Sequence, residues 1–255
     1  MVDTVLSADG TSIAFEAAGR GPALVIVGGA LSTRHSASAL ARILESRFMV
    51  YSYDRRGKGD SGDTPPYAVE REIEDLRAVG LVAGSSACFY GQGSGAAIAL
   101  EAAERGVPMS KIAVYDPPYR VDLAADQIEA RAARIDAALE AGSEEEALEI
   151  FVGDSMPDTL GYMKQAAYWP GMVRLAHTLP YDFAIAKDGA IPPERFAAVG
   201  VPALVMNGGD SPSWEGRTVE AIVRSIPGAE RLTIGGQDDE VDPATIAPFL
   251  MDFFG

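Results

Sequence analysis

Short apolar runs and longer segments with helical spacing take turns along this chain of 255 residues. A continuous apolar run predicts a strand that is buried on both faces, whereas apolar residues three or four positions apart predict an amphipathic helix. The predicted strands are residues 23–27, 48–53, 87–90, 111–115, 202–206 and 231–234. The predicted helices are residues 36–44, 69–82, 95–103, 217–225 and 243–253. Strands that alternate with helices indicate an α/β fold with a parallel sheet and helices on both faces.

Two segments depart from this alternation. Residues 1–20 alternate around Asp9 and Gly10, which predicts an opening β-hairpin. Residues 121–194 carry helical patterns only and lie between two predicted strands of the sheet. We expect them to form a helical cap over the carboxyl edge of the sheet, where open α/β folds bind their ligands. The predicted core then comprises residues 1–120 and 195–255.

The balance of charges bears on the partners of the protein. The chain has 21 basic and 37 acidic residues and a formal net charge of -16. Such a charge repels nucleic-acid phosphates and anionic lipid headgroups, so we expect neither nucleic acid nor a membrane as a partner. The beginning of the chain does not look like a secretory leader, and we expect a cytoplasmic protein. We expect a small-molecule substrate and keep a homodimer as an open alternative.

Candidate metal ligands are few and scattered. His35, His177 and Cys88 lie far apart in the sequence, and Cys88 is expected to be a small buried hydrophobe, so we predict no metal site. The glycines that follow residues 87–90 fit the G-x-G-x-x-G pattern of dinucleotide sites only in its weaker variant, with Ala96 in the third position. With neither a metal site nor a clear dinucleotide pattern, we predict no cofactor.

The most informative stretch is Gly91-Gln92-Gly93-Ser94-Gly95, which joins a predicted strand to a predicted helix. A G-x-S-x-G sequence at such a junction forms a nucleophile elbow, a strained turn that exposes the central serine. Here the central residue is Gly93, and Ser94 comes one position later. The sequence therefore predicts the turn without its nucleophile. Ser94 is expected to contribute its backbone amide at the start of the helix, with a displaced nucleophile as the alternative.

Three further segments occur in order around this turn: Val27-Gly28-Gly29-Ala30-Leu31, Asp54-Arg55-Arg56-Gly57-Lys58-Gly59-Asp60-Ser61-Gly62 and Gly236-Gln237-Asp238-Asp239-Glu240-Val241-Asp242-Pro243. With these segments the chain resembles the α/β-hydrolase superfamily over essentially its whole length. It is similar to small hydrolases of the actinobacterial type that carry a helical cap. The resemblance implies a mostly parallel eight-stranded sheet with helices on both faces.

The resemblance also implies which residues stand at the catalytic positions. Gly93 stands where the family has its nucleophile, and Asp239 stands where it has its histidine. Asp210 is the best candidate for the acid that follows the seventh strand. The backbone donors of the oxyanion hole are expected at Ala30 and Ser94, and a change of side chain elsewhere does not remove them.

Acyl-enzyme chemistry requires a nucleophile and a base whose protonation switches near neutral pH. Glycine supplies no nucleophile, so we do not expect an acyl-enzyme. We hypothesise that Asp239 and Asp210 face each other, which would raise one pKa and provide a proton donor or acceptor. The alternatives are that Asp239 is a solvated member of an acidic run and that Asp210 caps the next helix.

Several other residues are expected to line the substrate site, on the strength of their position near the resembling motifs or of their aromatic side chains. For His35 and His177 the alternative is a surface or packing role. The predicted substrate-binding residues are Gly29, Leu31, His35, Gly93, Trp169, His177 and Trp214.

These predictions converge on an enzyme that uses the hydrolase scaffold without the Ser-His pair. We expect a cyclase, lyase or isomerase that acts on a small apolar carbonyl compound, a biosynthetic intermediate, through oriented binding and oxyanion stabilisation. Two alternatives stay open: a ligand-binding protein without catalysis, and a hydrolase in which water attacks directly, with Asp239 or His35 as the base.

Overall fold

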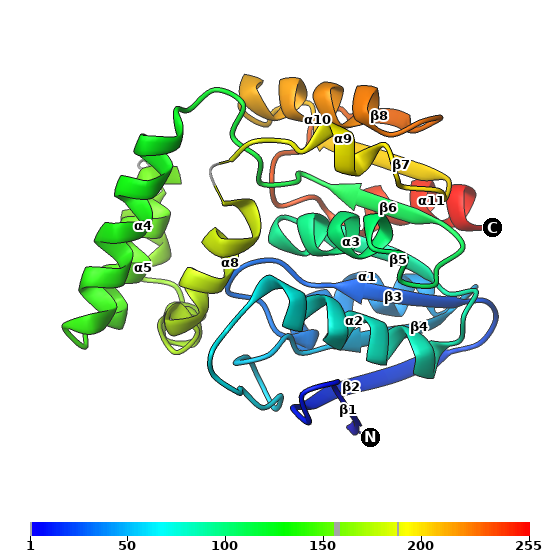
Figure 1. The fold of residues 1–255 in the computed structure, drawn as a ribbon, viewed down its shortest axis with the longest axis horizontal. Helices are drawn as coiled ribbons and strands as arrows, with labels where there is room; N and C mark the ends of the chain where they lie inside the picture. The colour runs from blue at the N-terminus through cyan, green and yellow to red at the C-terminus, as the bar shows by residue number, and fades with distance from the viewer. Residues whose placement is uncertain (1, 156–158, 188) are drawn as a thin grey trace.

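The computed structural model describes residues 2–155, 159–187 and 189–255. Within these residues, eight strands form one sheet in the order β1-β2-β4-β3-β5-β6-β7-β8 (Figure 1). The strands are β1 (Asp3–Leu6), β2 (Ser12–Gly19), β3 (Ala23–Val27), β4 (Met49–Tyr53), β5 (Cys88–Gln92), β6 (Ile112–Tyr115), β7 (Ala203–Gly208) and β8 (Glu230–Ile234). The predicted α/β fold with an eight-stranded sheet is confirmed.

The sheet is antiparallel at the edge formed by β1 and β2 and parallel in the rest. β1 and β2 form the expected antiparallel hairpin, and β2 also pairs antiparallel with β4. All pairs from β4 through β3, β5, β6 and β7 to β8 are parallel. The parallel strands therefore end at a common carboxyl edge, which brings the loops that follow β3, β5, β6 and β7 together.

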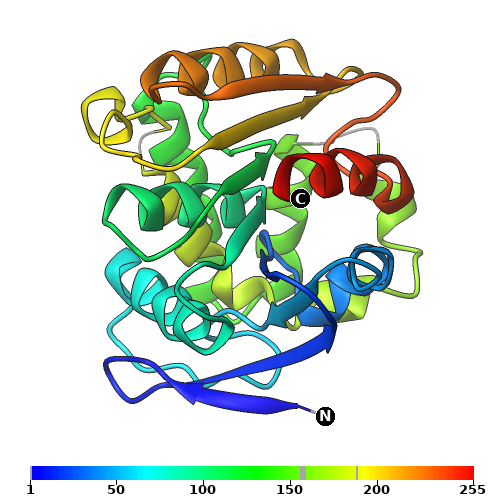
Figure 2. The same ribbon diagram turned by 90° about the vertical axis from the view of Figure 1, so that its right-hand side faces the viewer.

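The core lies on both faces of the sheet because successive side chains of a strand point to opposite sides. Val25 and Val27 pack on one face, whereas Leu24 and Ile26 pack on the other. The first face is covered by α2 (Val69–Ala83), α3 (Ser94–Glu104) and α10 (Ser213–Ser225), and the second by α1 (Ser38–Leu44) and α11 (Pro243–Phe254) (Figure 2). A short 3-10 helix, η1 (Arg34–Ala37), precedes α1.

The segment between β6 and β7 is helical, and its helices α4, α5 and α8 lie beside the sheet (Figure 1). They have their own apolar cluster, which includes Ile135, Leu148, Trp169 and Leu179. The last short helix packs instead on α3 and α10 of the core. The limits of the predicted cap, residues 121 and 194, stay a prediction. The elements of the segment are α4 (Ala125–Glu140), α5 (Glu144–Ser155), α6 (Leu160–Met163), α7 (Trp169–Val173), η2 (Ala176–Thr178), α8 (Leu179–Ala186) and α9 (Pro193–Phe196).

One helix boundary differs from the prediction in a way that matters for the site. The predicted helix 217–225 begins at Ser213, directly after Pro212. Proline favours the start of a helix because its ring presets the backbone angle. Trp214 and Glu215 therefore lie in the first turn of α10 and not in a loop. In the part of the chain that the structure describes, no helix has the length and apolar character needed to cross a membrane.

Candidate functional site

The turn between β5 and α3 has the conformation of a nucleophile elbow. Gly93, at its tip, has φ 55° and ψ -127°, which is strained for any residue with a side chain. Its neighbours are glycines for a steric reason. A Cβ at Gly95 would lie 2.2 Å from the carbonyl oxygen of Val27, and one at Gly91 would lie 2.4 Å from that of Gly95. These two glycines let strand and helix approach each other.

Gly93 differs from its neighbours because space surrounds it. A Cβ placed on Gly93 would have the Cα of Gly29, 3.9 Å away, as its nearest atom. Glycine is therefore not required there by close packing. The turn presents an open position where a side chain would fit, and that position faces a hollow.

Two adjoining cavities, of about 610 and 510 Å³, meet over Gly93. The first lies against the loops that follow β3 and β6 and against the start of α11. The second extends under the cap helices α4, α5 and α8. Residues that line both cavities are Ala30, Gly93, Pro118, Trp214, Glu215 and Asp239.

The two predicted oxyanion donors border this space. Ala30 lines both cavities, and Ser94 lines the second. As the first residue of α3, Ser94 has a backbone N–H that the helix itself leaves without an acceptor, and the helix dipole favours negative charge at the same point. Among the described residues, Ala30 N–H donates to no backbone acceptor. The arrangement can bind an oxyanion, and the role of these two amides stays a prediction.

Three of the acidic residues that line the first cavity come from different parts of the fold: Asp116 after β6, Glu215 in α10 and Asp239 after β8. Asp116 and Glu215 are 8% and 5% exposed. Burial, followed by the charge and hydrogen bonding of Glu215, raises the pKa of Asp116 to about 9. Burial also raises the pKa of Glu215. A carboxyl whose pKa lies above neutral pH can donate a proton.

Asp239 is more accessible than the other two carboxyls. It lines both cavities and remains open to solvent, and partial burial and the charge of Asp238 raise its pKa. Its loop is held in place by backbone contacts. Gln92 Nε2 donates to the carbonyl of Asp239 at 3.0 Å, and the Tyr115 hydroxyl donates to the carbonyl of Asp238 at 2.5 Å. These contacts fix the backbone of the loop at the point where Asp239 lines the two cavities.

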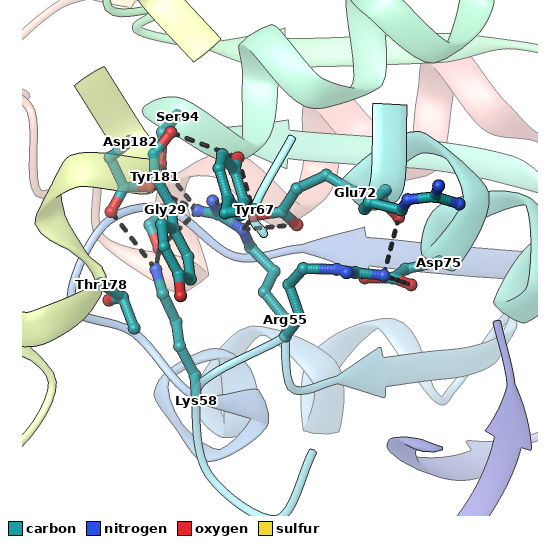
Figure 3. A network of polar contacts seen from close by, with 12 residues as sticks. Gly29, Arg55, Lys58, Tyr67, Glu72, Asp75, Ser94, Thr178, Tyr181 and Asp182 are labelled. Carbon is teal, nitrogen blue, oxygen red and sulfur yellow. Dashed lines mark hydrogen bonds and ion pairs between the residues drawn. The ribbon is translucent and has the colours of Figure 1, made fainter. Parts of the chain in front are cut away.

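A buried network of charges lies beneath the elbow (Figure 3). Arg55 binds Asp182 of the cap helix α8 at 2.6 Å and Glu72 of α2 at 2.7 Å. Lys58 lies 3.5 Å from Asp182, and burial and then the charge of Arg55 lower the pKa of Lys58 to about 8. Ser94 Oγ donates to Asp182 Oδ1 at 2.6 Å and accepts from Arg55 Nη1 at 2.9 Å. The hydroxyl of Ser94 is thus engaged in this network.

The structure separates the two acids that the sequence hypothesis paired. Asp210 is exposed and lines neither cavity, so the expectation that it faces Asp239 is wrong. Its backbone amide instead donates to the carbonyl of Gln237 at 2.8 Å. Asp116 and Glu215 occupy the wall next to Asp239, and neither was predicted from the sequence as an acid of the site. The signal was the position of Asp116 directly after β6, at the carboxyl edge.

The predicted ligand contacts divide into two groups. Gly29, Gly93 and Trp214 line the cavities, and Trp214 also stacks under the guanidinium of Arg120, 4.3 Å from the ring centre. The other four do not line either cavity. His35 is exposed. Leu31 packs against the apolar cluster of the cap.

Trp169 packs within the cap, and His177 connects the cap to the core; neither lines the two cavities. Trp169 is buried in the cap cluster, and its Nε1 donates to Glu145 at 3.1 Å. The two ring nitrogens of His177 lie 3.0 Å from the carbonyl oxygens of Arg174 and Gly57. In the described part of the chain, no three His, Cys, Asp or Glu side chains form a group that could hold a metal ion.

The fold and the elbow define the class of this protein, and comparison with known proteins agrees. The model of the alpha/beta hydrolase family matches residues 24–242. The chain belongs to this family. No curated protein matches its sequence.

Solved structures extend the likeness to the whole chain. An alpha/beta hydrolase from Sphaerobacter thermophilus DSM 20745 is 47% identical, with a TM-score of 0.94 over 99% of this chain and 100% of that one. A hydrolase from Pseudomonas aeruginosa PA01 shares the fold at 24% identity, with a TM-score of 0.82 over 100% of this chain and 98% of that one. An esterase from Exiguobacterium antarcticum shares it at 17% identity, with a TM-score of 0.80 over 100% and 99%.

Proposed function

We propose that this α/β-hydrolase-fold protein is an enzyme that transforms a small, mostly apolar carbonyl compound without a covalent intermediate, by isomerisation, elimination or ring closure. The observation that carries the proposal is the open position above Gly93, at the tip of an otherwise intact elbow. A scaffold that keeps the turn, the cavity and the amide donors can bind a carbonyl group. Without a side chain at residue 93 it cannot attack that group from the elbow.

The remaining groups suit acid–base chemistry. With its carbonyl oxygen at the amides of Ala30 and Ser94, a substrate would be polarised in the direction of an enolate. Asp239 lines the same space and acts as the base that removes a proton from the carbon next to the carbonyl. A carboxylate suits this role because its raised pKa strengthens it as a base while it remains open to the ligand.

The walls of the second cavity favour an apolar substrate. Leu123, Ile128, Phe151 and Phe183 line it under the cap. Apolar walls exclude water, which strengthens electrostatic contacts between an enolate and the backbone amides. We therefore expect aromatic or alicyclic ketones and lactones to bind better than short polar esters.

The direct test follows proton exchange, which does not require the natural substrate to be known. A panel of cyclic and aromatic ketones and lactones is incubated with the protein in D2O, and exchange of the proton next to the carbonyl is followed by NMR. Wild type is expected to accelerate exchange for at least one class, and Asp239→Asn is expected to reduce the rate about 100-fold or more, because it removes the base.

The matched control is Asp252→Asn, which changes an exposed carboxyl on α11 and is expected to exchange at the wild-type rate. The proposal is overturned if a serine-directed phosphonate labels the wild-type protein or if an acyl group is trapped on any side chain during turnover. Equal exchange rates in wild type and Asp239→Asn would remove Asp239 from the mechanism.

A second candidate, hydrolysis by direct attack of water, is favoured by the likeness to the alpha/beta hydrolase from Sphaerobacter thermophilus. The open position above Gly93 has room for a water molecule where the family has its nucleophile. This mechanism predicts slow ester turnover without a burst and without phosphonate labelling. An ester panel measured in pre-steady state separates it from the first candidate.

A further inference from the structure

The carboxyls of Asp116 and Glu215 form a buried pair that the proposed function does not yet use. Asp116 follows β6, and Glu215 lies in the first turn of α10. Both side chains are more than nine-tenths buried, yet both line the cavity next to Gly93. They come from different elements, so only the fold brings them together.

Each of the two carboxyls has a buried oxygen that no donor group satisfies. Among the described residues, Asp116 Oδ1 and Glu215 Oε2 have no partner that could donate a hydrogen bond. Ser211 Oγ lies 3.4 Å from Asp116 Oδ2, which is at the long end of a hydrogen bond. A buried acceptor without a donor is costly, and two such acceptors side by side are satisfied together if one of them carries a proton.

The charges around the pair favour that protonated state. Asp239 faces both carboxyls, and its negative charge opposes their ionisation. Arg120, which stacks on Trp214, is the positive group that acts on Glu215, but it is also bound to Asp122 at 2.9 Å. Two like charges buried in contact oppose each other's ionisation, which favours a state in which the pair holds one proton.

The backbone at Asp116 gives an independent sign of a specialised position. Asp116 has φ 44°, in the left-handed region that non-glycine residues rarely adopt. Strained residues of this kind cluster at active sites, where the surrounding structure holds them in place. Asp116, which has this backbone conformation, lines the wall of the first cavity.

We propose that Asp116 and Glu215 share one proton and act as the proton donor of the site, opposite Asp239 as the proton acceptor. The inference rests on the proposed function and adds the second half of its acid–base chemistry. The environment of the Asp116–Glu215 pair favours its protonated form, whereas Asp239 is proposed to act in its ionised form. The pair therefore serves as the acid and Asp239 as the base.

The donor points to a substrate class, namely carbonyl compounds with an oxygen leaving group at the β-carbon. The C–H bond next to the carbonyl breaks, its proton goes to Asp239, and the electron pair forms the enolate. The electrons then form the C=C bond as the C–O bond at the β-carbon breaks, and the pair protonates the leaving oxygen. A β-hydroxy compound thus yields an unsaturated carbonyl compound and water, and the proton on Asp239 passes to the pair, which restores both groups.

The first experiment asks whether the pair carries a proton and needs no substrate. Infrared spectra of the wild-type protein are expected to show the C=O stretch of a protonated carboxyl at neutral pH, which disappears as the pH rises past about 9. Asp116→Asn and Glu215→Gln are each expected to remove this titration, and Asn suits the positive φ as well as Asp does. Asp136→Asn, at an exposed position of α4, is the control and leaves the signal unchanged. A spectrum that is the same in wild type and both pair variants overturns the inference.

The second experiment tests the donor role with two ketones that differ only in the β-substituent, a hydroxyl or an acetoxy group. The hydroxyl needs a proton to leave, whereas acetate leaves as an anion. Asp116→Asn is expected to slow elimination of water about 100-fold or more, to slow elimination of acetate much less, and to retain exchange of the proton next to the carbonyl.

The outcomes separate the two proposals. If wild type catalyses neither exchange nor elimination, the proposed function fails and the donor role fails with it. If wild type catalyses both and Asp116→Asn slows both ketones equally, or neither, the donor role alone is refuted. Glu215→Gln repeats the comparison, so that a folding defect of one variant does not decide the result.

Discussion

At the scale of single residues, the elbow shows that turn geometry and nucleophile are separable. Gly91 and Gly95 are needed because strand and helix touch there, whereas a Cβ on Gly93 would have only the Cα of Gly29, 3.9 Å away, near it. The backbone of Gly93 keeps the strained angles that would expose a serine. The amide of Ser94 therefore stays at the cavity although the attacking group is missing.

The open position at Gly93 predicts that a nucleophile can be introduced there by substitution. In the double variant Gly93→Ser with Asp239→His, the new hydroxyl fits the open position and has an imidazole at the family's histidine position. We expect slow labelling by a serine-directed phosphonate, measured by mass spectrometry, and a loss of about 1–3 kcal/mol of stability from the strained backbone.

Two single variants serve as controls for the double variant. Gly93→Ser alone is expected to remain unlabelled, because residue 239 is then still an aspartate and no imidazole activates the hydroxyl. Gly95→Ala is expected to disrupt the fold, because its Cβ would collide with the carbonyl of Val27. A folded double variant that is never labelled would show that residues 93 and 239 do not stand at the two catalytic positions.

At the scale of elements, the helix α8 is the part of the cap that is bound to the core by buried charge. Asp182 of α8 contacts Arg55, Lys58 and Ser94 of the core. Next to it, the rings of Tyr181 and Tyr67 stack with their centres 3.9 Å apart. The cap is therefore anchored directly beneath the elbow, and a shift of α8 would reach the amide of Ser94.

Removal of this anchor is expected to be costly. Asp182→Asn leaves the buried cations Arg55 and Lys58 with one carboxylate fewer, and we expect a loss of about 3–5 kcal/mol in chemical denaturation. Burial alone would raise the pKa of Asp182, but the charges of Arg55 and Lys58 and the hydrogen bond from Ser94 lower it below 3.8. The difference in the free energy of unfolding between wild type and Asp182→Asn is therefore largest at neutral pH. It decreases as the pH falls through the lowered pKa of Asp182.

The control for this change is Glu220→Gln on α10. Its partner Arg224 is exposed, and an exposed ion pair on one helix is expected to contribute little to stability because solvent screens the two charges. Similar losses for the two variants, or a difference from wild type that grows with acidity, would contradict the anchoring role of Asp182.

Helices and strands were largely predictable from the sequence because each has a local cause. Apolar runs became the buried parallel strands, and Asp9 and Gly10 became the hairpin turn. The predicted start of α10 was too late, since the helix begins at Ser213, directly after Pro212 and before its apolar pattern. Because of this error, Glu215 was not predicted to lie in the first turn of α10, where it reaches the site.

At the scale of the whole molecule, the net charge of -16 acts at long range. We expect no measurable binding to phosphatidylserine vesicles or duplex DNA at low ionic strength, because repulsion is strongest where screening is weakest. Sedimentation with vesicles and a gel-shift assay check this. Binding that appears at low salt and disappears at high salt would indicate a local basic surface that overrides the net charge.

The sequence by itself determined the sheet, the elbow and the absence of a side chain at its tip, because apolar periodicity and the run of glycines act locally. It also named Asp239, through its place in a family pattern. Only the tertiary structure decided which acids meet. Asp116 and Glu215 lie 99 positions apart in the chain. They become neighbours because parallel strands end at one edge of the sheet. The same packing leaves Asp210 in solvent, because burial of a side chain depends on elements that are distant in the sequence.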